Sequence, residues 1–62
     1  MKRRELLKHL SENGCEELRE GGKHSIWHNP ALKKYSTIPR HTELSNYLCK
    51  KICRDLGVAP IG

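Results

Sequence analysis

In this chain of 62 residues, two histidines are the first side chains to consider for chemistry. His24 and His28 stand four positions apart in the stretch "GGKHSIWHNP", residues 21–30. Imidazole titrates near neutral pH, so a histidine can serve as a general acid, a general base or a metal ligand. His24 directly follows a glycine turn and Lys23. This context makes His24 the first candidate for a catalytic residue.

A metal site is the first alternative for these histidines. Residues 23–28 read as a strand, on which positions i and i+4 share a face but lie about 13 Å apart. That separation is too long for two ligands of one zinc ion. Cys49 and Cys53 lie four residues apart on a predicted helix and could chelate, but they lie on its apolar stripe. Buried cysteine commonly acts as a small hydrophobic side chain, so we expect neither a metal nor a cofactor.

Nucleophilic chemistry by a thiol is a second alternative. A reactive cysteine needs an electropositive, partly exposed setting, whereas Cys15 precedes Glu16 and Glu17, which should raise its pKa. We therefore predict that all three cysteines lie in the core or are bystanders. The odd count, without a CxxC pair, also does not suggest a disulfide framework. With no signal peptide and no long apolar run, the sequence predicts a cytoplasmic protein that does not enter a membrane.

Size and charge limit the kind of partner. The formal net charge is +5 and the sequence pI is about 9.4, a balance that favours a polyanion, most often nucleic acid. We expect one domain over residues 1–62. A domain of about 60 residues buries only roughly 60% of the surface that its unfolded chain exposes. Any site should therefore lie on an open face rather than in a large enclosed cavity.

The pattern of apolar residues and turn signals predicts an α+β fold. Residues 2–13 have helical spacing and end at Asn13-Gly14. Strands are predicted over 15–20, 23–28 and 34–38, with Gly21-Gly22 as a tight turn. A last helix begins near Ser45 as N-cap and ends at Gly57. The order α-β-β-β-α predicts a three-stranded antiparallel sheet with both helices on one face.

Strand parity then divides the side chains between the two faces of this sheet. Trp27 is the largest apolar residue and should point toward the helices. The side chains predicted to face the helices are Trp27, Ser25, Leu18 and Ile38. The side chains predicted to face the open side are His24, Ile26, His28, Glu17, Arg19, Tyr35 and Thr37.

Cations near His24 suggest how an open face could act on RNA. RNA carries its own nucleophile, the 2′-hydroxyl, so a cleaving protein needs a group to move protons and cations for the phosphate charge. Arg19, Lys23 and Arg40 are candidates to hold that phosphate. One positioned acid or base contributes on the order of 10²–10⁴-fold to a rate. A small site without a metal could thus be a sufficient ribonuclease.

Three segments of the chain together resemble a known family. They are residues 1–30, "STIPRHTEL" at 36–44 and "YLCKKICRDLGV" at 47–58. These segments are similar to the HicA toxins of bacterial type II toxin–antitoxin pairs. The resemblance implies a fold like that of a double-stranded RNA-binding domain, and an mRNA interferase that cleaves mRNA without a metal and arrests translation. It also implies a HicB-type antitoxin that binds the toxin and blocks its site.

The resemblance can be carried over residue by residue. The catalytic histidine of the family falls on His24, and Ser25 stands where many members have a second histidine. An arginine late in the first strand matches Arg19. The Pro-x-His segment of the family matches residues 39–41, which include Arg40 and His41. The resemblance thus supports RNA contacts by Arg19, Arg40 and His41, with His41 as a second candidate acid or base. Lys23 remains a candidate from its position beside His24, because many members have serine there.

Three functions follow from these observations. The first is a toxin endoribonuclease, in which His24 deprotonates the 2′-hydroxyl or protonates the leaving 5′-oxygen. The second is a non-catalytic RNA-binding module that uses the same basic face. The third is an interaction domain that acts only through its antitoxin. Cleavage of RNA in EDTA by the wild type, and its loss on His24→Ala, would distinguish the first from the others.

Overall fold

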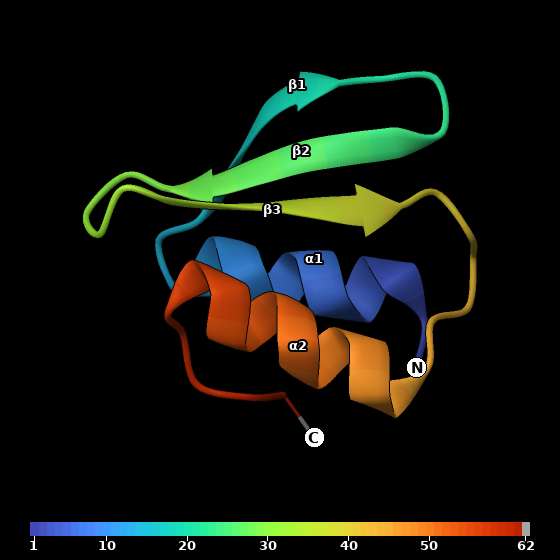
Figure 1. Ribbon diagram of the computed structural model, residues 1–62. Helices are drawn as coiled ribbons and strands as arrows, with labels where there is room; N and C mark the ends of the chain where they lie inside the picture. Colours follow the sequence, from blue (N-terminus) through green and yellow to red (C-terminus); the bar gives the residue numbers. More distant parts are fainter. Residues whose placement is uncertain (62) are drawn as a thin grey trace.

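The computed structural model describes residues 1–61, which form two helices and three strands. Along the chain these are α1 (Arg3–Glu12), β1 (Glu16–Glu20), β2 (His24–Asn29), β3 (Lys34–Pro39) and α2 (Asn46–Leu56). The order α-β-β-β-α confirms the predicted α+β fold (Figure 1).

The sheet is antiparallel with the order β1-β2-β3. Both helices lie along the same side of the sheet, and β1 is the strand farthest from them (Figure 1). In the part of the chain that the structure describes, no helix or strand covers the opposite side of the sheet. The β2–β3 register pairs His24 with Pro39, Ile26 with Thr37 and His28 with Tyr35, so these side chains share the open face.

The core lies between the sheet and the helices. Its fully buried side chains include Leu6 and Leu10 from α1, Ile52 and Leu56 from α2, and Ile38 from β3. Burying a side chain of this kind contributes about 1.5–3 kcal/mol. The alternation predicted for the second and third strands is confirmed by the exposed fractions of three side chains. Trp27 is 7% exposed and Ser25 is 0% exposed on the side of the helices, whereas Tyr35 on the open face is 59% exposed.

The prediction for the first strand was wrong at Leu18, which is 50% exposed instead of buried. The pairing shifts between Glu17 and Arg19: Glu17 pairs with Trp27, whereas Arg19 pairs with Ile26. This bulge leaves Leu18 without a cross-strand partner and breaks the simple alternation. It also puts Glu17 on the side of Trp27, contrary to the prediction, where it stays exposed because the helices do not reach this edge strand. Arg19 shares the open face with Ile26, as predicted.

The three cysteines are free thiols and belong to the core, as predicted. The pKa of the Cys15 thiol is raised first by its burial and then by the neighbouring Cys53. The sequence-based reasoning assigned this rise to Glu16 and Glu17, which was the wrong cause. Burial also raises the pKa of the Cys49 and Cys53 thiols. All three thiols are therefore held in the neutral form and serve as small apolar side chains.

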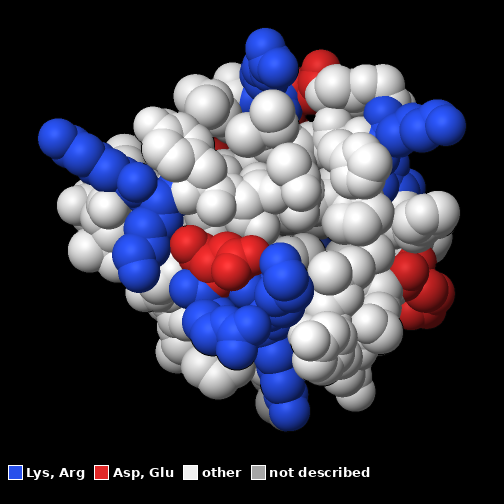
Figure 2. All heavy atoms as spheres, in the orientation of Figure 1, with Lys and Arg blue, Asp and Glu red and all other residues white. Residues whose placement is uncertain are grey.

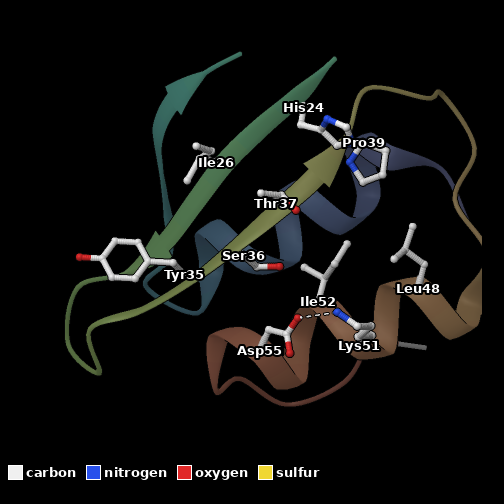
Figure 3. Close-up of a pocket in the computed structure, with 10 residues that line it drawn as sticks. All are labelled: His24, Ile26, Tyr35, Ser36, Thr37, Pro39, Leu48, Lys51, Ile52 and Asp55. Atoms are coloured by element: carbon white, nitrogen blue, oxygen red, sulfur yellow. Dashed lines mark hydrogen bonds and ion pairs between the residues drawn. The ribbon is translucent and has the colours of Figure 1, made fainter. Parts of the chain in front are cut away.

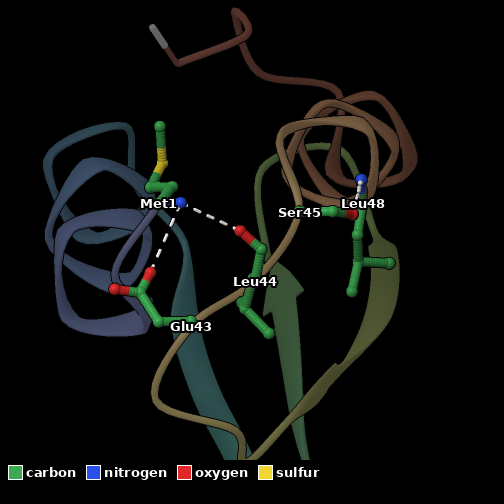
Figure 4. Close-up of polar contacts among 5 residues, drawn as sticks. All are labelled: Met1, Glu43, Leu44, Ser45 and Leu48. Atoms are coloured by element: carbon green, nitrogen blue, oxygen red, sulfur yellow. Dashed lines mark hydrogen bonds and ion pairs between the residues drawn. The ribbon is translucent and has the colours of Figure 1, made fainter.

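The ends of α2 are capped as its sequence predicts. The Ser45 hydroxyl accepts a hydrogen bond from the Leu48 amide at 3.1 Å (Figure 4). Gly57 ends the helix with φ of 74°, in the left-handed region that favours glycine. A Cβ atom at Gly57 would also lie 2.6 Å from a methyl carbon of the half-exposed Leu32 side chain, which would have to move aside; the main constraint on this position is its positive φ.

The segment that leads into α2 is also tied to the start of the chain. The amino group of Met1 donates a hydrogen bond to the Leu44 carbonyl oxygen at 3.0 Å and lies 3.6 Å from the Glu43 carboxylate (Figure 4). The Leu44 amide in turn donates to the Met1 carbonyl oxygen at 2.8 Å. These contacts fix the connection between β3 and α2 beside the beginning of α1.

Candidate functional site

The turn between β1 and β2 places His24 at the beginning of β2. The Gly21 amide donates a hydrogen bond to the His24 carbonyl oxygen at 2.8 Å and closes the turn. A Cβ atom at Gly21 would lie 3.1 Å from that same oxygen, whereas one at Gly22 would meet nothing within 4 Å. A side chain at residue 21 would thus crowd the backbone contact that closes the turn. Because Ser25 points into the core, the His24 side chain is directed to the open face and is exposed.

Three surface depressions meet at His24. The loop depression is lined by Gly22, Lys23, His24, Arg40 and His41. The face depression extends over the open side of the sheet and is lined by Arg19, Glu20, Gly21, Gly22, Lys23, His24, Ile26 and Thr37. The edge groove passes along β3 to α2 and is lined by His24, Ile26, Tyr35, Ser36, Thr37, Pro39, Leu48, Lys51, Ile52 and Asp55 (Figure 3). His24 is the residue that all three share.

The structure therefore brings all five predicted site residues to one end of the sheet. Lys23, Arg40 and His41 line the loop depression with His24, and Arg19 lines the face depression with it. A backbone hydrogen bond of 3.3 Å from the Arg40 amide to the Lys23 carbonyl oxygen holds the segment after β3 against the β1–β2 turn. This contact explains why Lys23 and Arg40, which are 17 positions apart in the sequence, border the same depression.

Glu20 modifies the charge of this site in a way that the sequence did not indicate. Its carboxylate lies 3.0 Å from the Arg40 guanidinium, and both side chains are about half exposed. An exposed ion pair of this kind contributes little stability, but it offsets part of the positive charge of Arg40 and restrains its position. Lys23 and Arg19 are then the cations at this end with no ion-pair partner among residues 1–61.

Arg3 is a residue of the site region that the sequence analysis missed. From α1 its guanidinium donates hydrogen bonds to the Pro39 carbonyl oxygen at 2.9 Å and to the Ser25 hydroxyl at 2.8 Å. Pro39 and Ser25 are the direct neighbours of Arg40 and His24. Arg3 therefore fastens the ends of β2 and β3 together beneath the site. The signal in the sequence was an arginine on the apolar stripe of the first helix, in register with Leu6 and Leu10.

The other end of the open face carries an aromatic pair. The rings of His28 and Tyr35 are stacked, with centroids 5.9 Å apart and planes inclined by 19°. The imidazole of His28 also lies 3.2 Å from the Glu16 carboxylate. His28 is thus engaged with its own neighbours at the opposite end of β2 from His24. Among residues 1–61, no three His, Cys, Asp or Glu side chains are grouped so that they could hold a metal ion.

On the face of the molecule in Figure 2, the basic side chains lie in several separate groups, one of which lies over α2 beside acidic atoms. On α2, the ammonium group of Lys51 lies 3.0 Å from the Asp55 carboxylate. Within residues 1–61, no helix has the length and apolar composition that crossing a membrane requires. Lys51 of α2 also lines the edge groove, but it is paired with Asp55. The other cations that border the three depressions at His24 are Lys23 of the turn, Arg19 of β1 and Arg40 after β3.

An exposed imidazole with cations on two sides can bind an anionic group and exchange protons with it. Comparison with families of known proteins matches residues 3–58 to the HicA toxin of bacterial toxin–antitoxin systems. Neither the curated proteins nor the solved structures give a significant match. The family match covers most of the chain, including every residue around His24. The chain therefore belongs to the HicA toxin family of bacterial toxin–antitoxin systems.

Proposed function

We propose that this toxin is a metal-independent endoribonuclease that cleaves mRNA and that His24 is its catalytic residue. The observation that carries the proposal is the position of His24, exposed at the meeting point of three depressions that together contain Arg19, Lys23, Arg40 and His41. A phosphate placed against His24 would have cations on both sides. Such an arrangement offers both charge stabilisation and a group for proton transfer.

In the proposed reaction the 2′-hydroxyl oxygen of one nucleotide attacks its own phosphorus atom. The hydroxyl loses its proton, the bond between phosphorus and the 5′-oxygen breaks, and that oxygen gains a proton. The products are a 2′,3′-cyclic phosphate and a free 5′-hydroxyl. His24 acts at one of these proton transfers, as base toward the 2′-hydroxyl or as acid toward the 5′-oxygen. His41 lines the loop depression together with His24 and is the candidate for the other proton transfer.

Three cations are proposed to hold the scissile phosphate. Lys23 lines both the loop depression and the face depression, so it borders His24 from the turn. Arg19 lies on the open face beside Ile26, and Arg40 lies beyond β3 in contact with Glu20. Contacts to phosphate oxygens of this kind carry little sequence information. The antitoxin, of the HicB type, is proposed to neutralise the toxin by covering this end of the sheet.

The test compares His24→Ala with His9→Ala, both purified, on a single-stranded RNA in the presence of EDTA. His9 lies on α1, and its ring is 2.8 Å from the Ala59 carbonyl oxygen, so it serves as a histidine control outside the site. We expect the wild type and His9→Ala to cleave, and His24→Ala to be slower by about 10²–10⁴-fold. Equal cleavage by His24→Ala and the wild type would contradict the assignment. Growth arrest on expression should follow the same order.

One observation favours a second candidate, a non-catalytic RNA-binding module. Within residues 1–61 the ring of His24 makes no side-chain hydrogen bond, whereas catalytic bases are commonly oriented by a further group. The same basic end of the sheet would then bind RNA without cutting it. Binding by the wild type without cleavage in EDTA would favour this alternative.

A further inference from the structure

The edge groove extends the site away from His24 to the far end of the open face. It begins at His24 and Pro39 and continues past Ile26 and Thr37 to Tyr35 (Figure 3). On β2, His24 and His28 are four residues apart, and Tyr35 pairs with His28, so the two ends of this path are about 13 Å apart. A few nucleotides of an extended strand can span that length.

Tyr35 has the properties of a surface for a planar ligand. It is 59% exposed, although one side of its ring is stacked against His28. The imidazole of His28 lies 3.2 Å from the Glu16 carboxylate on β1, and this contact restrains the ring on which Tyr35 stacks. Tyr35 lies at one end of the open face and contributes no side chain to the core, and more than half of its surface is exposed to solvent. Nucleobases stack on aromatic side chains in this way, and such stacking accepts any base.

We propose that Tyr35 is a base-stacking subsite and that the RNA bound across His24 is single-stranded there. This inference rests on the proposed function for the identity of the ligand as RNA. A base can stack on a side chain only when it has left the stack of a duplex. The phosphate would lie against His24 while a base a few nucleotides away covers Tyr35. The edge groove between them, lined by Ile26 and Thr37, would hold the intervening strand.

The experiment measures binding of a short, fluorescein-labelled single-stranded RNA by anisotropy, with His24→Ala as the parent so that cleavage is slow during the measurement. Tyr35→Ala and Tyr35→Phe are made in this parent. Tyr47→Ala is the matched control, because Tyr47 is 77% exposed on α2 and does not line the edge groove. Base stacking on an aromatic side chain is worth about 1–3 kcal/mol, so we expect Tyr35→Ala to weaken binding by about 5- to 150-fold. Tyr35→Phe and Tyr47→Ala should bind nearly as the parent does.

A duplex of the same sequence provides the second measurement. We expect it to bind more weakly than the single strand and to be insensitive to Tyr35→Ala. Unchanged binding of the single strand by Tyr35→Ala would overturn the inference. The two proposals fail separately. A wild type that binds but never cleaves RNA contradicts the ribonuclease, whereas a cleaving wild type with an insensitive Tyr35 contradicts only the subsite.

Discussion

Replacing Arg3 by methionine tests whether a contact from α1 holds the site end of the sheet together. The guanidinium is half-buried and donates to the Pro39 carbonyl oxygen at 2.9 Å and to the Ser25 hydroxyl at 2.8 Å. Methionine keeps much of the apolar stem and its helix propensity but removes both donors. The Ser25 side chain, which is 0% exposed, would lose the partner that it has in this structure.

The size of the effect follows from these contacts. A hydrogen bond that involves a charged group contributes about 1.5–3 kcal/mol, and a buried polar group left without a partner costs about 1–3 kcal/mol. Because Arg3 is only half-buried, water would replace part of what is lost, so we expect a loss of about 2–3 kcal/mol. Domains have about 0.05–0.15 kcal/mol of stability per residue, which gives roughly 3–9 kcal/mol for this chain. The substitution should therefore remove a large part of the total.

Urea unfolding followed by circular dichroism measures this change, with the slope of the transition expected to stay constant. Arg4→Met is the matched control, since Arg4 is the exposed neighbour of Arg3 on α1. The double variant with Ser25→Ala should show a coupling energy of about 0.5–3 kcal/mol with Arg3→Met. The reasoning is refuted if Arg3→Met lowers the free energy of unfolding no more than Arg4→Met does.

Two further predictions concern the turn and the core. Gly21→Ala should slow RNA cleavage and lower stability by about 1 kcal/mol, because its Cβ would lie 3.1 Å from the His24 carbonyl oxygen; Gly22→Ala, with nothing within 4 Å, should be near neutral in both assays. Burial raises the pKa of the Cys49 and Cys53 thiols in the folded chain above the ordinary value of 9.0. As the pH rises, these thiols therefore lose their protons in the unfolded chain before they do so in the folded chain. Their contribution to the free energy of unfolding is complete below pH 9.0 and falls above it. Urea unfolding under reducing conditions from about pH 7 to 10 should show a weaker decline for Cys49→Ala than for the wild type; equal declines would contradict it.

The order of elements and the position of His24 could be predicted because local signals agree with one another. Trp27 is the largest apolar side chain and was therefore assigned to the core. Because successive side chains of a strand point to opposite faces of the sheet, this assignment also put Ser25 in the core and His24 on the open face. The Ser45 cap and the Gly57 stop are read directly from residue types. Each of these inferences depends on neighbours in sequence, which is the information that a sequence displays most clearly.

What could not be predicted depends on contacts between distant residues. Alternation along the first strand put Leu18 in the core, but its bulge is set by how an edge strand pairs with β2 and by where the helices end. The pair between Glu20 and Arg40 joins β1 to the segment after β3, although β1 and β3 are not adjacent in the sheet. Arg3 stands on an apolar stripe, and only the fold reveals that carbonyl and hydroxyl oxygens of the sheet lie opposite it.

These contacts indicate how a chain this small can hold an exposed catalytic candidate in place. The ring of His24 has no side-chain hydrogen bond within residues 1–61, so its position must come from its backbone. Gly21 contacts its carbonyl oxygen from the turn, and Arg3 fixes the next residue, Ser25, from below. The core side of β2 thus stabilises the fold, and the open side remains free for the proposed contact with RNA. A substitution beneath the sheet, such as Arg3→Met, should therefore slow the proposed cleavage without changing any residue that we propose to contact RNA. That result would separate the positioning of His24 from RNA binding.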